Sequence, residues 1–155
     1  MNSNKGENAL EHSIHYLLMA DHTMLQKLVW NRIKPLGLTT GQPKVLDFLQ
    51  DHDGAMQKDI AQGCHIEPSS LSTILGGMER AGLIERSTRG ENRRTVYVWL
   101  TAHGREQCAR LNEIFAAAEA EALGGFTDAE IEQARGLLER IYRSLNHEKG
   151  DRKQI

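Results

Sequence analysis

The chain has 155 residues and a net charge of −2, with 39% hydrophobic and 26% charged residues, which favours a globular protein of one domain or two small lobes. No apolar run approaches the roughly 20 residues of a membrane-spanning helix, so we expect no membrane segment. Residues Met1–Asn8 are polar and carry no apolar core of a secretory signal, which favours the cytoplasm. The two distant cysteines, Cys64 and Cys108, favour a reduced, disulfide-free chain.

The first third of the chain predicts three helices. Leucines and isoleucines at helical spacing predict a helix with an apolar stripe from about residue 8 to 34, which Pro35 and Gly37 would end. A second helix is expected to begin near Thr39, because Thr39 and Gln42 fit a capping box. A short third helix is predicted over Gln57–Cys64.

The stretch Glu67–Gly82 predicts a fourth helix close behind the third. Pro68 suits the first helical position, and Gly82 suits the position after the last turn. The apolar face carries Leu71, Ile74, Leu75 and Met78, and the opposite face carries Ser69, Thr73, Gly76 and Arg80. Two short helices joined by a tight turn are typical of a helix-turn-helix. On these residues alone, the small polar face fits a DNA-reading helix and a solvated surface helix equally.

After Gly82 the hydrophobic period changes from 3.6 to 2, which predicts a hairpin of Leu83–Ser87 and Thr95–Leu100. The ten residues from Glu85 to Arg94 hold four arginines and two glutamates. The arginines are Arg86, Arg89, Arg93 and Arg94. Such a stretch can bind phosphate locally although the whole chain is acidic. The hairpin is therefore interpreted as a wing, with an ordinary edge hairpin carrying solubilising arginines as the alternative.

Two further helices are predicted after the hairpin. Thr101 would open a helix to about Leu123, and Thr127 with Glu130 forms a capping box for the last helix. Both helices show an apolar three-four repeat like that of a coiled coil. The repeats are Cys108, Leu111, Phe115, Ala118 and Ala122, then Ile131, Ala134, Leu138, Ile141 and Leu145. We expect the first and last helices to pack on those of a second copy in a homodimer, with intrachain packing as the alternative.

These elements predict a mainly α fold with a small β-hairpin wing, in which a winged helix-turn-helix lobe is joined to N- and C-terminal dimerisation helices. The expected organisation is an N-terminal dimerisation helix (1–34) and a winged helix-turn-helix DNA-binding domain (35–101). C-terminal dimerisation helices (102–146) and a flexible tail (147–155) would follow.

In its order of elements, the chain resembles the MarR family of winged-helix transcription factors over about residues 10–145. The residues that carry the likeness are Leu38–Gln42, Gln57–Ala61, Met78–Arg86, Asn92–Arg94 and Leu100–Gly104. The resemblance implies a homodimer that binds a pseudo-palindromic operator in double-stranded DNA. Such proteins repress, or less often activate, nearby genes, and a small-molecule effector commonly releases them from DNA.

The resemblance also implies roles for individual residues. The fourth helix would enter the major groove, with Pro68 setting its start and contacts from Ser69, Ser70, Ser72 and Thr73. In the wing, Arg94 would enter the minor groove, and Arg86, Arg89 and Arg93 would contact phosphates or the groove. Hydroxyls discriminate base edges weakly, so we expect specificity to depend on the wing arginines and on DNA shape. The chain departs from the family pattern at Asn92, where an aspartate is common, and at Gly76-Gly77, where charged residues are common.

In the family, effectors commonly bind in the crevice between the dimerisation helices and the winged lobe. The candidate lining residues here are His15, Met19, His22 and Trp30. A redox- or metal-sensing regulator and a winged-helix protein-interaction module are the alternatives. The histidines show no tight spacing of metal ligands, and neither cysteine lies on the first helix, where the redox-sensing branch has its reactive thiol. No catalytic or cofactor motif is present, so we expect neither an enzyme nor a bound cofactor.

Overall fold

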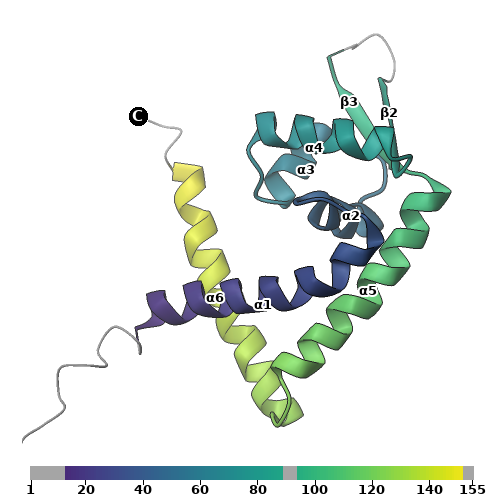
Figure 1. Ribbon diagram of the computed structural model, residues 1–155. Helices are drawn as coiled ribbons and strands as arrows, with labels where there is room; N and C mark the ends of the chain where they lie inside the picture. The colour runs from purple at the N-terminus through teal and green to yellow at the C-terminus, as the bar shows by residue number, and fades with distance from the viewer. Residues whose placement is uncertain (1–12, 89–93, 152–155) are drawn as a thin grey trace, which may run out of the picture. The chain divides into compact units, whose positions relative to one another are not determined.

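The computed structural model describes residues 13–88 and 94–151, which contain six α-helices, one 3₁₀ turn and three strands (Figure 1). The elements in chain order are α1 (Ile14–Ile33), η1 (Lys34–Leu36), α2 (Gln42–Asp51), β1 (Ala55–Met56), α3 (Gln57–Gly63), α4 (Pro68–Arg80), β2 (Ile84–Thr88), β3 (Val96–Leu100), α5 (Ala102–Ala122) and α6 (Asp128–Asp151). The prediction of a mainly α fold with a β-hairpin wing is confirmed. The chain divides into two compact units after residue 118, within α5. Among the described helices, none is both long and apolar enough to cross a membrane.

The sheet has a third strand that the sequence did not predict. It is antiparallel with strand order β1-β3-β2. The hairpin pairs Ile84 with Leu100 through to Thr88 with Val96, and Ala55 of β1 pairs with Val98 on the other side of β3. Two residues are too few to show an alternating pattern, so β1 exists only through its pairing with β3.

Helix α2 begins later than predicted, at Gln42 rather than near Thr39. The Thr39 amide still donates to Oε1 of Gln42 at 3.0 Å, which is half of the expected capping box. Gly41, however, takes the left-handed conformation with φ of 88° and occupies the position before the helix. This φ favours glycine, and a Cβ at residue 41 would in addition meet the end of the Ile74 side chain of α4.

One apolar core holds the first unit together. It receives side chains from the end of α1, from α2, α3 and α4, from the sheet and from the first half of α5. The fully buried members include Ile33, Leu46, Leu49, Ile60, Leu71, Leu75, Met78, Leu83, Ile84 and Leu111. Cys108 and Leu111 of α5 therefore pack inside their own chain rather than on a seam for a second copy. An apolar three-four repeat can pack either inside its own chain or against a second copy. In α5, Cys108 and Leu111 are buried in the core of the winged lobe.

In the second unit, the predicted capping box at the start of α6 is confirmed. The Thr127 amide donates to Oε2 of Glu130 at 2.8 Å, and the Glu130 amide donates to Oγ1 of Thr127 at 3.3 Å. These hydrogen bonds hold the pKa of the Glu130 carboxyl below its usual value. The reciprocal bonds satisfy amides that have no partner inside the helix.

Candidate nucleic-acid interface

Helix α4 has both of its ends determined by local sequence. Pro68 occupies the first position after the extended residue Glu67, as predicted. At the other end Gly82 has φ of 70°, and its amide donates to the Glu79 carbonyl at 3.0 Å. The amide of Leu83 donates to the Met78 carbonyl at 2.9 Å, which completes a Schellman motif. The interface helix therefore starts and stops where its own residues dictate.

The turn before α4 is tight. His65 takes a left-handed conformation with φ of 53°, which is uncommon for a residue other than glycine. The Ile66 amide donates to the Ala61 carbonyl at 2.9 Å and closes α3. From α3, Nε2 of Gln57 donates to Oγ of Ser72 on α4 at 2.9 Å. These contacts fix α4 against α3 as the second helix of a helix-turn-helix.

The structure brings the predicted major-groove residues together on the exposed side of α4. Pro68, Ser69, Ser70, Ser72 and Thr73 are all exposed, while Leu71 and Leu75 on the opposite side are fully buried. Thr73 donates to the Ser69 carbonyl at 3.4 Å, so its hydroxyl also serves the helix itself. A row of short polar side chains on an outward helix face can approach the base edges of a major groove.

The predicted wing residues have different positions. Arg86 on β2 is tied to α4, because its Nε and Nη2 donate to Oε2 of Glu79 at 3.0 and 2.6 Å. This contact lowers the pKa of the Glu79 carboxyl. Arg94 is exposed two residues before β3. Arg89 and Arg93 lie outside the described residues.

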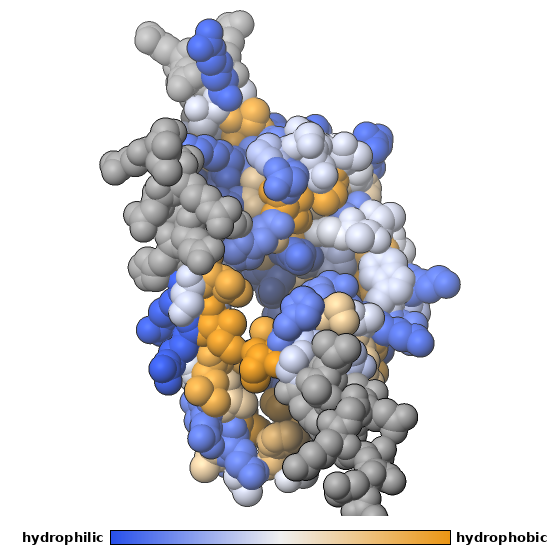
Figure 2. Space-filling view, turned by 90° about the vertical axis from the view of Figure 1, so that its left-hand side faces the viewer, coloured by the Kyte–Doolittle hydropathy of each residue, from blue (hydrophilic) through white to orange (hydrophobic). Residues whose placement is uncertain are grey.

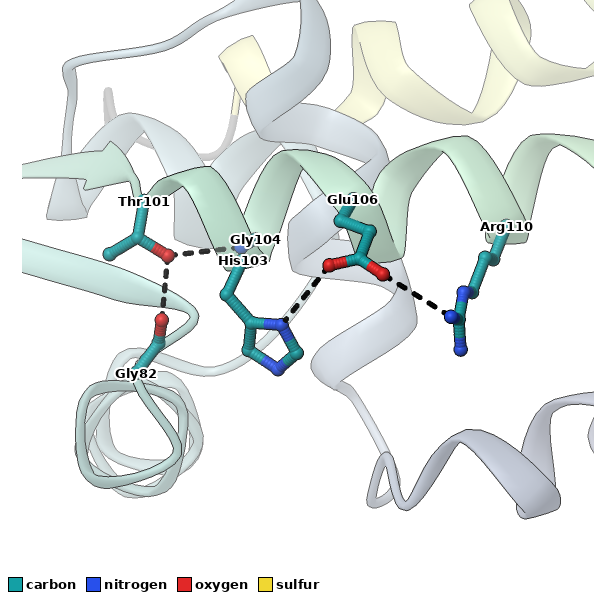
Figure 3. A network of polar contacts seen from close by, with 6 residues as sticks. All are labelled: Gly82, Thr101, His103, Gly104, Glu106 and Arg110. Atoms are coloured by element: carbon teal, nitrogen blue, oxygen red, sulfur yellow. Dashed lines mark hydrogen bonds and ion pairs between the residues drawn. The ribbon is translucent and has the colours of Figure 1, made fainter.

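A polar joint links the end of α4 to the start of α5 (Figure 3). Oγ1 of Thr101 donates to the Gly82 carbonyl at 2.6 Å and accepts from the Gly104 amide at 3.0 Å. The Thr101 amide donates to the Leu83 carbonyl at 3.1 Å. A Cβ at Gly104 would lie far inside van der Waals contact of that carbonyl oxygen. Only glycine therefore allows α5 to start this close to the α4–β2 connection.

Further along α5, a short row of exposed charges lies beside this joint (Figure 3). Nδ1 of His103 lies 3.8 Å from Oε2 of Glu106, and Nη2 of Arg110 donates to its Oε1 at 3.2 Å. All three side chains are about half exposed, so the row contributes little to stability.

Asp53 holds the wing through two further contacts, which the sequence did not predict. Its Oδ1 accepts from the Leu100 amide at 2.8 Å, and its Oδ2 accepts from Nη2 of Arg105 at 2.7 Å. One carboxylate in the turn before β1 thus holds both the end of β3 and the first turn of α5. An aspartate in a polar turn was visible in the sequence, but its partners lie 47 and 52 residues away.

The candidate effector residues share one face of α1. His15, Met19 and His22 recur at helical spacing, and Trp30 lies near the same face two turns later. All four side chains are exposed. Their role stays a prediction.

The two cysteines are buried and protonated. The Cys64 thiol is 4% exposed and donates to the Lys44 carbonyl at 3.5 Å, and the Cys108 thiol is 3% exposed and donates to the Leu46 carbonyl at 3.6 Å. Burial raises the pKa of both thiols to about 11. Redox sensing needs an accessible thiolate, and neither residue provides one. Across the described ranges, no three His, Cys, Asp or Glu side chains are grouped to hold a metal ion.

Residues 36–95 match the model of the MarR family. An HTH-type transcriptional repressor from Mycobacterium bovis is 28% identical over 126 residues, which cover 81% of this chain and 91% of that protein. A MarR-family transcriptional regulator from Rhodococcus sp. RHA1 has a similar structure, with a TM-score of 0.79 and 25% identity over 87% of this chain and 96% of that one.

The repressor CouR shares the fold in two further structures. Bound to a 23-mer DNA duplex, it gives a TM-score of 0.80 at 24% identity over 92% of this chain and 99% of its own. The structure of CouR from Rhodococcus jostii RHA1 bound to p-coumaroyl-CoA gives 0.77 at 24% identity, over 87% and 95% of the two chains. At this identity, the likeness concerns the fold alone.

Proposed function

Because this chain belongs to the MarR family of transcriptional regulators, we propose that it is a homodimeric DNA-binding repressor that a small-molecule effector releases from its operator. Transcriptional regulators of this kind are not enzymes, as expected from the sequence. The proposal assigns residues 35–101 to DNA binding and residues 1–34 and 102–146 to association. It places the protein in the cytoplasm with the DNA.

The observation that carries this proposal is the exposed polar side of α4 next to an arginine-bearing hairpin. A major groove about 12 Å wide accepts one α-helix, and α4 has both ends fixed and short side chains on the first turns of its exposed side. In the proposed complex, Ser69, Ser70, Ser72 and Thr73 face base edges. Arg94 reaches the adjacent minor groove from the wing, and Arg86 contributes through its Nη1 while Glu79 holds its other nitrogens.

Exposed apolar side chains support the homodimer. Large hydrophobic residues are open to solvent on α1 and, in the other unit, on α6 (orange in Figure 2). They include Ile14, Leu17, Leu18, Met19, Met24 and Leu25 on α1, and Leu137, Leu138, Tyr142 and Leu145 on α6. Exposed apolar side chains in such numbers commonly mark an interface. A C₂ dimer would present two copies of α4 to half-sites about one helical turn apart.

For effector release, we propose the α1 face that carries His15, Met19, His22 and Trp30 as part of the ligand site. The joint of Thr101, Gly104 and Gly82 supports a route from α5 to the interface helix, because its hydrogen bonds connect the first turn of α5 to the end of α4. The fold relative CouR is a repressor with a small-molecule complex, which is consistent with this proposal.

The test is a gel-shift titration with a duplex selected by the protein from a random pool. Wild-type affinity should fall steeply as salt rises, because bound Lys and Arg release counterions from DNA. Replacing Arg94 with alanine should weaken binding about tenfold and relax the preference in the flanking minor groove. Arg140→Ala, which removes an exposed arginine of α6 that is not part of its apolar repeat, is the matched control and should bind like the wild type.

Two results would contradict the proposal at different points. If Arg94→Ala kept both affinity and sequence preference, the wing assignment would be wrong. If the wild type showed no salt-dependent DNA binding at all, the winged-helix fold would serve protein interaction instead.

A further inference from the structure

The middle of α4 has no side chains on two consecutive residues, Gly76 and Gly77. Their own chain does not require glycine at either position. A Cβ at residue 76 would meet only Nη1 of Arg80, at 3.5 Å, and a Cβ at residue 77 would meet Nε2 of Gln42 at 3.4 Å and Nη2 of Arg80 at 3.8 Å. These are ordinary van der Waals distances. Glycine destabilises a helix interior relative to alanine, so helix formation does not explain why both positions are glycine.

The side chain that covers both glycines is Arg80. Its two terminal nitrogens are the atoms next to the vacant Cβ positions of residues 76 and 77. Side chains in a helix point back toward the N-terminus over the preceding turn. The guanidinium of Arg80 therefore lies about one turn before its own Cα, beside the glycine pair. The positive charge of Arg80, a residue of the last turn of α4, thus lies near the middle of the helix.

Arg80 also lies on the outward face of α4. Ser69, Thr73, Gly76 and Arg80 follow one another at spacings of four, three and four residues, so they share one side of the helix. Arg80 is exposed, whereas Met78 beneath this face is fully buried.

Arg80 and Arg86, the two arginines at this end of α4, differ in their hydrogen bonding. Nε and Nη2 of Arg86 are bound to Glu79. Within residues 13–88 and 94–151, no hydrogen bond or ion pair holds the guanidinium of Arg80. Its planar fork of donors is therefore available to a partner in the groove.

We propose that Arg80 reads a guanine in the major groove, with its guanidinium seated on Gly76 and Gly77, and that it is the main base-specific contact of α4. This inference rests on the proposed DNA binding. Arginine donates in bidentate fashion to O6 and N7 of guanine, whereas the hydroxyls of Ser69 and Thr73 discriminate weakly among bases. The glycine pair keeps the helix thin at the level of the guanidinium, so the backbone approaches the floor of the groove.

The experiment is selection from a random duplex pool by the wild type, Arg80→Lys, Arg80→Ala and the control Arg140→Ala, with thermal melting of each to verify folding. The wild type and the control should enrich one motif with a guanine in each half-site. Both Arg80 variants should lose the preference at that guanine and keep the rest of the motif. On the wild-type duplex, changing the guanine to adenine should weaken the wild type about tenfold or more and leave Arg80→Ala nearly unaffected.

A further variant tests the glycine pair. Gly76→Gln keeps Arg80 but fills the space where the guanidinium lies, so it should lose the same guanine preference. A Gly76→Gln protein that kept the preference would show that the glycine seat has no part in readout.

Three outcomes separate this inference from its alternatives. If both Arg80 variants enriched the wild-type motif, the inference would be overturned. Arg80 would then only stabilise the helix through its positive charge near the C-terminus. A uniform loss of affinity with a smaller salt slope would make Arg80 a phosphate contact and overturn it as well. A wild type that enriches no motif would contradict the proposed DNA binding itself.

Discussion

Burial makes Cys64 and Cys108 unreactive, which separates this chain from a thiol-based sensor. Both thiols have a pKa of about 11 because their surroundings exclude water from the thiolate. At neutral pH they stay protonated and donate to carbonyls of α2. Neither thiol has the thiolate character that peroxide attacks.

We predict that both thiols react slowly with Ellman's reagent at pH 8 in the native protein and rapidly in urea, and that peroxide leaves DNA binding unchanged. Because the folded pKa lies above the ordinary value of 9.0, the contribution of these thiols to stability is complete below about pH 9 and is lost as the pH rises toward 11. Urea titrations between pH 8 and 11 measure that loss. Fast labelling of either thiol in the native protein would contradict the assignment.

At the scale of elements, the contact between α5 and the α4–β2 connection depends on Gly104. A methyl group there would collide with the Leu83 carbonyl oxygen, and backbone cannot move aside as a flexible side chain can. The same carbonyl accepts from the Thr101 amide, so a shift would also disturb this joint.

Gly104→Ala is therefore expected to lower the free energy of unfolding by about 1–3 kcal/mol, as overpacking does. Gly76→Ala is the matched control, because its methyl would meet only Nη1 of Arg80 at 3.5 Å. It should raise the free energy of unfolding by about 1 kcal/mol through helix propensity. Urea unfolding of both variants measures the difference, and effects of the same sign would be inconsistent with the packing described for Gly104.

For the whole molecule, exposed apolar residues predict association. Leu138 on α6 is 54% exposed and lies on the repeat that includes Ile141 and Leu145. In a dimer this repeat would be buried, and a carboxylate placed in it would be strongly unfavourable.

Leu138→Glu should shift the protein from dimer to monomer in light scattering coupled to gel filtration and should abolish binding to a two-half-site duplex. Gln133→Glu adds the same charge to an exposed polar position of α6 and should remain dimeric. A dimer that persists in Leu138→Glu would mean that this repeat is not at the interface.

The sequence by itself determined both ends of the interface helix and the start of α6. Pro68, Gly82 and the pair Thr127 and Glu130 act through hydrogen bonds to neighbours within a few residues, so their patterns are complete in a short window of sequence. The alternation in the hairpin was equally local, which is why both strands were placed within one residue.

Only the tertiary structure decided the contacts between distant segments. The pairing of Ala55 with Val98, the contacts of Asp53 and the burial of Cys108 each join residues tens of positions apart. An apolar repeat predicts that a helix face is buried. It does not predict which element packs against that face, because the hydrophobic effect has no direction. The position of Arg80 beside Gly76 and Gly77 is a further example. The sequence showed two glycines that weaken a helix, and only the tertiary structure showed that a guanidinium lies next to them.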